Sequence, residues 1–188
     1  MGSRDDILNR IAARRPGYSL DQPFYTDPEW FAADLQHVWY REWLFVGHAC
    51  ELARPGAFFT LQVGDYPVIV VRDREGRIRA FHNACRHRGS RICSAARGTS
   101  ARLVCPYHQW TYDLDGRLVF ARQMGDGFDP AAFGLKPVAC EAVAGYVFLS
   151  LADAPADFAP TRALIEPYLA PHRLQDAKVA FETTIVEK

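Results

Sequence analysis

The chain has 188 residues, 49% hydrophobic and 23% charged, which is typical of a soluble globular protein with a sizeable core. Its 22 basic and 22 acidic residues cancel, so the charge gives no reason to expect a nucleic-acid or membrane partner. No apolar run approaches the ~20 residues of a membrane span, and the start lacks the apolar core of a secretory signal, so we expect a cytoplasmic protein.

The N-terminal region is predicted to be an arm followed by one helix. Residues 1–25 contain proline and glycine and read as irregular. The segment 26–43 predicts a helix, which Thr26 or Asp27 can cap and in which Pro28 suits the first turn. Its apolar side chains recur at helical spacing and, with the nearby tryptophans, are expected in the core: Trp30, Phe31, Leu35, Val38, Trp39 and Trp43.

From residue 43 the pattern changes to short β-branched or aromatic segments separated by Gly, Pro or Asp. These segments predict an antiparallel β domain, with a turn at 73–76 and a hairpin at Asp115-Gly116. The predicted strands are 44–49, 57–63, 66–73, 77–83, 109–114, 117–121 and 145–151.

The C-terminal region is predicted to be a linker helix and a strand. Residues 161–172 favour a short helix that Pro167 interrupts. Residues 178–188 alternate like a strand and end at Lys188, so we expect the start of a further α+β domain. The predicted division is 1–42 for the arm and helix, 43–152 for the β domain and 153–188 for the linker and first strand.

Two short boxes carry the chemistry: Cys85 and His87, then Cys105 and His108, with seventeen residues between the boxes. Two thiolates and two imidazoles suit either a tetrahedral zinc ion or a [2Fe–2S] cluster of the Rieske type. Zinc sites usually pair like with like, whereas each box here supplies one cysteine and one histidine. The order therefore favours the Rieske cluster, while zinc and four unrelated residues remain the alternatives.

Residues near the boxes can support such a cluster. Gly89 and Gly98 allow tight loops, and the Tyr112 hydroxyl can reach back toward a cysteine sulfur. Trp110 reads equally as a core aromatic and as a neighbour of the cluster. Three arginines in the first box would favour the reduced state and attract an acidic electron donor, unless they are simply solvated: Arg86, Arg88 and Arg91.

The segments CRHRGSRIC and CPYHQWTYDLDG resemble the boxes of the large (alpha) subunits of Rieske non-haem iron oxygenases. The similarity extends over PFYTDPEWF, REWLFVGHACEL, GLKP and AKVAFETTIVEK. It is greatest to the branch that demethylates glycine betaine and related quaternary ammonium compounds. One departure is Gln109, where many members of the family carry glycine.

The resemblance implies a Rieske β-sandwich with Cys85 and Cys105 on the inner iron and His87 and His108 on the outer one. It implies electrons from an NAD(P)H-dependent reductase or a ferredoxin, a trimeric full-length subunit, and a mononuclear non-haem Fe(II) outside this chain that activates O₂ for N-demethylation. Aromatic-ring-hydroxylating dioxygenases, a stand-alone Rieske ferredoxin and a zinc-stabilised binding module are the alternatives.

The remaining histidines and cysteines are not expected to be catalytic. Four histidines are scattered singly, without the pairing and nearby acid of a mononuclear iron site: His37, His48, His82 and His172. The other three cysteines are expected to be small buried hydrophobes, and an odd total of five argues against a disulfide framework: Cys50, Cys93 and Cys140.

Overall fold

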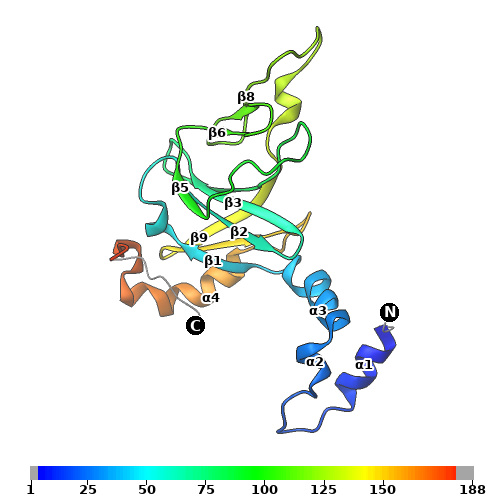
Figure 1. The fold of residues 1–188 in the computed structure, drawn as a ribbon. Helices are drawn as coiled ribbons and strands as arrows, with labels where there is room; N and C mark the ends of the chain where they lie inside the picture. Colours follow the sequence, from blue (N-terminus) through cyan, green and yellow to red (C-terminus); the bar gives the residue numbers. More distant parts are fainter. Residues whose placement is uncertain (1–3, 181–188) are drawn as a thin grey trace, which may run out of the picture.

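The computed structural model describes residues 4–180 and contains two antiparallel sheets with helices at both ends of the chain (Figure 1). The larger sheet has the order β1-β10-β9-β4-β3-β2-β5, and the smaller one has the order β6-β7-β8. The strands are β1 Leu44–His48, β2 Ala57–Val63, β3 Tyr66–Arg72, β4 Ile78–His82, β5 Arg97–Thr99, β6 Leu103–Val104, β7 Thr111–Tyr112, β8 Leu118–Phe120, β9 Pro137–Val143 and β10 Tyr146–Ser150. The predicted mainly antiparallel β architecture is confirmed.

Every predicted strand is present, but three strands escaped prediction: β5, β6 and β9. Strands β5 and β6 are only three and two residues long, too short to show an alternating pattern. Strand β9 opens with Pro137 and carries Glu141 in a half-buried position, which weakens its signal. It nevertheless lies between β10 and β4, because its backbone pairs with both.

Strand β3 lies between β4 and β2 in the larger sheet and is buried on both faces. Val68 and Val70 point into one hydrophobic cluster, and Ile69 and Val71 point into the other. This division follows from the two-residue period of a strand, which sends successive side chains to opposite faces. Each of these side chains stabilises the fold by roughly 1.5–3 kcal/mol through burial.

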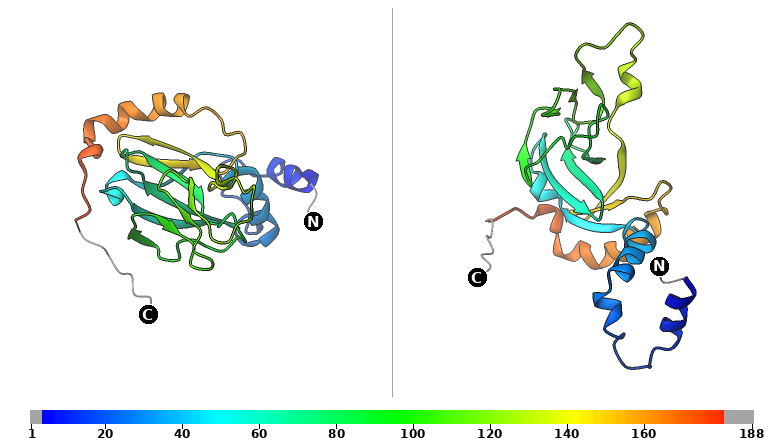
Figure 2. Two further views of the ribbon diagram at one scale, coloured as in Figure 1. Left: turned by 90° about the horizontal axis from the view of Figure 1, so that it is seen from above. Right: turned by 45° about the vertical axis from the view of Figure 1, so that its right-hand side comes forward.

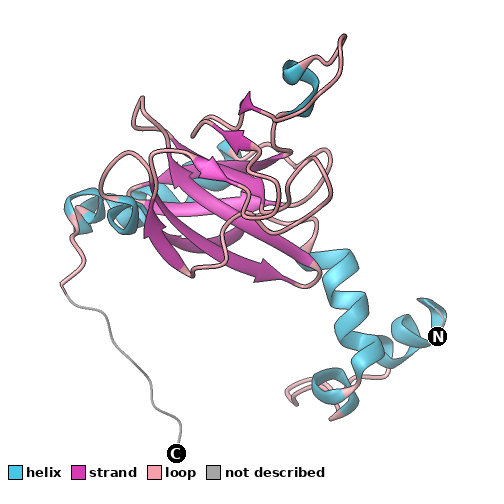
Figure 3. Cartoon of the chain, turned by 45° about the horizontal axis from the view of Figure 1, so that its top comes forward, coloured by secondary structure: helices cyan, strands magenta, loops and turns pink. Residues whose placement is uncertain are grey.

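The smaller sheet packs against one face of the larger sheet (Figure 3), and the box cysteines Cys85 and Cys105 belong to the hydrophobic cluster between the sheets. Strands β2, β3 and β4 of the larger sheet contribute Phe58, Ile69 and Phe81 to this cluster. The first box follows β4, and the second box is the loop between β6 and β7. The fold thus brings the boxes together, although seventeen residues separate them in sequence.

The N-terminal helices stand off the sheets (Figures 1 and 2). They are α1 Arg4–Ala12, α2 Pro23–Thr26 and α3 Pro28–Asp34, and α3 continues into the π-helix η1 Leu35–Trp39. The Asp27 carboxylate caps α3 by accepting from the Glu29 amide at 2.9 Å, as expected. The prediction of an irregular arm was wrong over α1, because Pro16 and Gly17 lie beyond the end of that helix and do not interrupt it.

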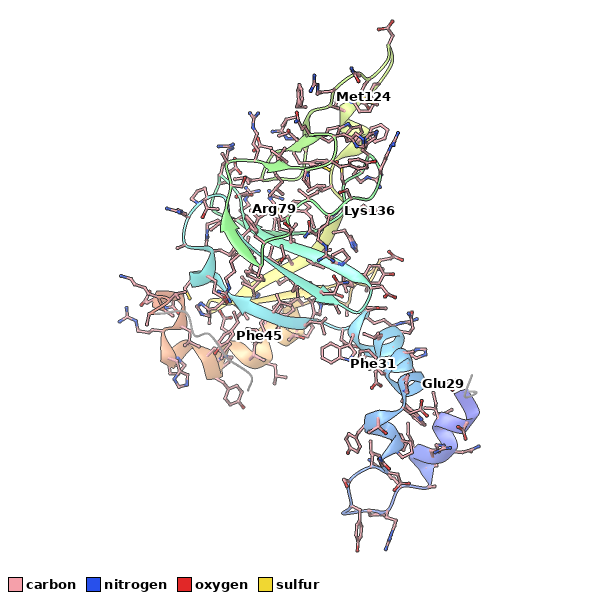
Figure 4. The ribbon with its side chains drawn as sticks, in the orientation of Figure 1. Glu29, Phe31, Phe45, Arg79, Met124 and Lys136 are labelled. Atoms are coloured by element: carbon pink, nitrogen blue, oxygen red, sulfur yellow. The ribbon has the colours of Figure 1, made fainter. Side chains whose placement is uncertain are left out.

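The apolar stripe of the N-terminal helix is not in the core. Phe31 is 60% exposed and Trp39 is 46% exposed, so the prediction of core positions was wrong for them. The pattern identified an apolar face correctly, but the helix projects beyond the sheets; Figure 4 shows Phe31 on this projecting part. Tyr40, at the end of η1, is the buried anchor, and its hydroxyl accepts from the Asp65 amide at 3.1 Å.

At the C-terminal end, α4 Ala159–Leu169 runs along the larger sheet without a break at Pro167, so the predicted interruption was wrong. Proline removes one backbone donor, but the carbonyl of exposed Ala163 that loses its partner can bond to water. Short 3₁₀ turns follow at η4 Ala170–His172 and η5 Leu174–Asp176. Residues 178–180 have no regular structure, and the rest of the predicted strand lies outside the described residues.

None of the helices that the structure describes has the length and apolar character needed to cross a membrane.

We predict that Gly64→Ala will destabilise the fold more than Gly76→Ala. Both glycines have positive φ, +53° and +82°, which costs a residue with a side chain roughly 1–2 kcal/mol. A Cβ at Gly64 would lie 2.0 Å from the Tyr40 hydroxyl oxygen, whereas a Cβ at Gly76 would meet nothing within 4 Å. Urea unfolding should therefore show an extra loss of about 1–3 kcal/mol for Gly64→Ala. Equal losses in the two variants would mean that Tyr40 does not anchor the N-terminal helix.

Candidate metal centre

The first box forms a tight loop that its own backbone closes. The amide of Gly89 donates to the carbonyl of Cys85, and the amide of Cys85 donates to the carbonyl of Ser90, both at 2.8 Å. Gly89 has a φ of +72°, which lets the chain reverse directly after the residues around His87.

The second box has the same pattern of hydrogen bonds. The amide of Gln109 donates to the carbonyl of Cys105 at 3.0 Å, and the amide of Cys105 donates to the carbonyl of Trp110 at 2.9 Å. Gln109 adopts a φ of +62°, in the position that Gly89 occupies in the first loop. The two loops therefore have equivalent backbones, and each presents one cysteine at its start and one histidine near its turn.

Gly98 does not shape either loop, contrary to expectation. It lies in β5 without a positive φ, and a Cβ there would meet the Phe58 ring at 2.8 Å. Its role is to let β5 approach the phenyl ring of β2.

The two box cysteines are buried side by side as free thiols. Cys85 is 4% exposed and Cys105 is 1% exposed. Burial, and then the proximity of Cys105, raise the pKa of Cys85. Two adjacent thiolates in an apolar core repel each other, so both can ionise only if a positively charged centre lies between them. This pair is therefore suited to binding a metal.

The two box histidines form a second pair. Their rings are 4.6 Å apart, and Nδ1 of His87 is buried with no hydrogen-bond partner within residues 4–180. Desolvation, and then the neighbouring His87 and Arg88, lower the pKa of His108. A lowered pKa favours the neutral imidazole, which is the form that binds metals. The orphaned nitrogen of His87 is a donor atom without a partner in the folded chain.

The arrangement of the two cysteines and two histidines helps to decide between a zinc ion and a [2Fe–2S] cluster. Nowhere in the described part of the chain do three or more His, Cys, Asp or Glu side chains gather closely enough to hold one metal ion. A tetrahedral zinc site needs all four ligands around one point. A Rieske cluster needs two cysteines on one iron and two histidines on the other. Two separate pairs fit the binuclear cluster better, and the assignment of the four ligands stays a prediction.

Tyr112 connects the second loop to the first. Its hydroxyl lies 3.3 Å from the Cys85 sulfur and accepts from the Arg86 amide at 3.0 Å. Burial, and then the hydrogen bond with Cys85, raise the pKa of Tyr112, so the hydroxyl keeps its proton. With the amide of Arg86 as its donor, the hydroxyl has its own proton free to point at the sulfur of Cys85.

Each box histidine lies against an aromatic ring. Trp110 is 2% exposed and stacks on His87, with ring centroids 4.9 Å apart and an interplanar angle of 11°. Tyr107 is 61% exposed and lies over His108, with centroids 3.7 Å apart. The two interpretations of Trp110 are compatible, since it is both a core aromatic and a neighbour of a predicted ligand.

Asn83 supports the first loop, a role that its sequence context did not reveal. Its buried side chain accepts from the amides of Ile92 and Cys93 at 3.1 and 3.0 Å and donates to the carbonyl of Cys93 at 2.7 Å. The only signal was a polar residue at the end of an apolar strand, two positions before Cys85. Its partners lie nine and ten residues away, beyond the reach of local patterns.

The other candidate residues play lesser parts. The three arginines are exposed, and neither Arg86 nor Arg88 has an ion-pair partner among the residues described, so the attraction of an acidic donor stays a prediction. His48 caps a 3₁₀ turn, η2 Ala49–Leu52, through its Nδ1. The remaining cysteines are half-buried rather than fully buried, and burial raises the pKa of Cys93 to about 11 and, with Glu141, that of Cys140 to about 12.

The sequence has clear relatives. The family model of the Rieske [2Fe-2S] domain matches residues 42–139. The chain is 51% identical over 187 residues to the glycine betaine monooxygenase oxygenase subunit of Chromohalobacter salexigens, covering 99% of this chain and 42% of that protein. It is 39% identical over 155 residues to the biphenyl 2,3-dioxygenase subunit alpha of Rhodococcus jostii, covering 80% and 34%.

Solved structures agree. The quaternary ammonium Rieske monooxygenase CntA in complex with L-carnitine matches with a TM-score of 0.72 and 29% identity, covering 79% of this chain and 43% of that one. Naphthalene 1,2-dioxygenase from Rhodococcus sp. matches with a TM-score of 0.80 and 26% identity, covering 90% and 40%. The chain thus spans less than half the length of these relatives.

We predict that Gln109→Gly will raise the free energy of unfolding by roughly 0.5–1 kcal/mol. Glycine would remove the strain that a residue with a side chain suffers in the left-handed backbone conformation. Part of this gain would be offset, because glycine has more conformational freedom in the unfolded chain. Gly89→Ala, at the equivalent position of the first loop and with open space around its Cβ, should lower stability by a similar amount. A destabilised Gln109→Gly variant in urea unfolding would contradict the equivalence of the two loops.

We predict that Tyr112→Phe will lower the reduction potential of the loaded protein by about 40 mV. A hydrogen bond to the Cys85 sulfur strengthens as negative charge grows on it, and its loss should cost the reduced state roughly 1 kcal/mol. The matched control is Tyr107→Phe, because no hydrogen bond of the Tyr107 hydroxyl is present among the described residues. A redox titration with equal potentials for both variants would show that the Tyr112 hydroxyl does not act on the sulfur.

Proposed function

The chain belongs to the family of Rieske [2Fe-2S] domains, and from that premise we propose that it is the electron-relaying part of an oxygenase large subunit that N-demethylates a quaternary ammonium compound such as glycine betaine. The observation that carries the proposal is the pairing of Cys85 with Cys105 and of His87 with His108 on two equivalent loops. When bound, a Rieske cluster accepts and releases one electron at a time.

The cysteine edge and the histidine edge of the site differ in their exposure to solvent. The thiol edge is closed, because Cys85 and Cys105 are buried and Tyr112 occupies the space beside them. The histidine edge is open, because His108 is only partly buried and Tyr107 beside it faces solvent. Electrons would therefore enter and leave at the histidine edge. Two exposed arginines flank that edge and would favour a donor protein with acidic groups: Arg86 and Arg88.

The oxygen chemistry would take place elsewhere in the subunit. A mononuclear iron site needs two histidines and a carboxylate grouped around one ion, and residues 4–180 contain no such group. We therefore assign the mononuclear non-haem Fe(II) and the substrate pocket to a part of the subunit outside these residues. The described chain would supply electrons and no catalytic residue.

The choice of substrate rests on sequence identity. The fold does not separate the two substrate classes, because the naphthalene dioxygenase structure has a higher TM-score than the carnitine complex. Identity does separate them, at 51% to the glycine betaine enzyme against 39% to the biphenyl enzyme. Hydroxylation of an N-methyl carbon would give a carbinolamine that breaks down to formaldehyde and the demethylated amine. An aromatic-ring dioxygenase is the second candidate.

The proposed reaction needs further components. An NAD(P)H-dependent reductase or a ferredoxin would deliver the electrons, which would place the system in the cytoplasm. The full-length subunit would assemble as a homotrimer, so that the histidine edge of one subunit faces a neighbour. A stand-alone ferredoxin fits less well, because relatives that cover 99% and 80% of this chain are oxygenase subunits.

The test is an assay of the complete subunit with its reductase against glycine betaine, carnitine and a simple arene. We expect formaldehyde from an ammonium compound, and two irons with two acid-labile sulfides in the Rieske domain of the subunit. Diol from the arene with no formaldehyde would favour the dioxygenase. One zinc per chain without iron would overturn the proposal altogether.

A further inference from the structure

Trp110 links the two loops of the centre. Its backbone carbonyl accepts from the Cys105 amide at 2.9 Å and closes the second loop. Its indole stacks on His87, which belongs to the first loop, at 4.9 Å and 11°. The residue that completes one loop therefore covers the histidine of the other, so the position of His87 depends on both.

The indole ring is held in place from its other side. Phe128 and Phe133 contact it edge-on, each with centroids 5.7 Å away and with interplanar angles of 63° and 88°. These two phenyl rings stack on each other at 4.9 Å. Both phenylalanines belong to the segment between β8 and β9, in which Figure 4 labels Met124. Since Trp110 is 2% exposed, it has no room to turn, and a fixed indole gives His87 a fixed neighbour.

Within residues 4–180, His108 has no comparable support. The ring over it belongs to Tyr107, the preceding residue, which is 61% exposed. An exposed ring on a loop is free to move or to contact a partner, whereas a ring inside the core is not. The two histidines therefore occupy different environments, although their loops have equivalent backbones.

We propose that Trp110 is a positioning residue, which fixes the ring of His87 and holds the reduction potential of the centre down. The inference rests on the proposed function, in which His87 is a ligand. An indole face is rich in electrons and attracts positive charge, and an imidazole bound to iron is more positive in the oxidised state. The buried indole also keeps water from the ring of His87, and water there would stabilise the more negative reduced state. Both effects favour the oxidised state.

The experiment compares Trp110→Phe and Trp110→Leu with the matched control Tyr107→Leu, which removes the ring over the other histidine. Each variant is loaded, checked for iron and sulfide, and measured by redox titration and by the nitrogen hyperfine couplings of its histidines. We expect the potential to rise in the order wild type, Trp110→Phe, Trp110→Leu. One of the two histidine couplings should change in the Trp110 variants, while Tyr107→Leu leaves the potential near that of wild type.

An unchanged or lowered potential in a fully loaded Trp110→Leu protein would overturn the inference, as would an equal rise in Tyr107→Leu. If Trp110→Leu fails to fold, Trp110→Phe decides by the same criteria, because phenylalanine keeps the site apolar. Phe128→Leu adds a check that leaves the indole intact, and it should shift the potential in the same direction by less. A wild-type protein without two histidine couplings would instead overturn the proposed function, and this inference with it.

Discussion

The centre of this structure depends on one electrostatic constraint: two cysteine thiols lie side by side in an apolar core. Ionising either thiol there is costly, and ionising both is prohibitive without a compensating positive charge. Cys85 and Cys105 have no disulfide between them and little solvent around them. The loops, the buried hydroxyl of Tyr112 and the two box histidines can all be understood as groups arranged around a charge that the protein itself does not supply.

The fold encloses the sulfur side of the centre and leaves its imidazole side near the surface. The sheets and the Tyr112 hydroxyl enclose the sulfur side, where low polarity strengthens each hydrogen bond. The imidazole side reaches the surface beside Tyr107. An enclosed side preserves the ligands from exchange with solvent, and an open side shortens the distance to another protein. A domain that relays electrons, as we propose for this one, needs both.

The sequence was informative where the physics is local. Alternating side chains and turn residues located the long strands, and the order of Cys and His residues indicated the kind of centre. It was uninformative where the partner is distant or absent. The helical pattern showed the apolar face of Phe31 and Trp39 but not that this face projects beyond the sheets. Gln109 concealed a left-handed position that glycine would have revealed, and the backbone partners of Asn83 lie nine and ten residues away.

The placement of β5 has a consequence for assembly. This edge strand lies within the stretch of about 20 residues between Cys85 and Cys105 and pairs only with β2 among the strands described. A metal centre that joins the two cysteines acts as a cross-link around that stretch, and a cross-link of this span restricts the unfolded chain by roughly 3 kcal/mol. Binding of the cofactor would thus stabilise the stretch that contains β5, and hydrogen exchange in this strand would report on how completely the centre has been filled.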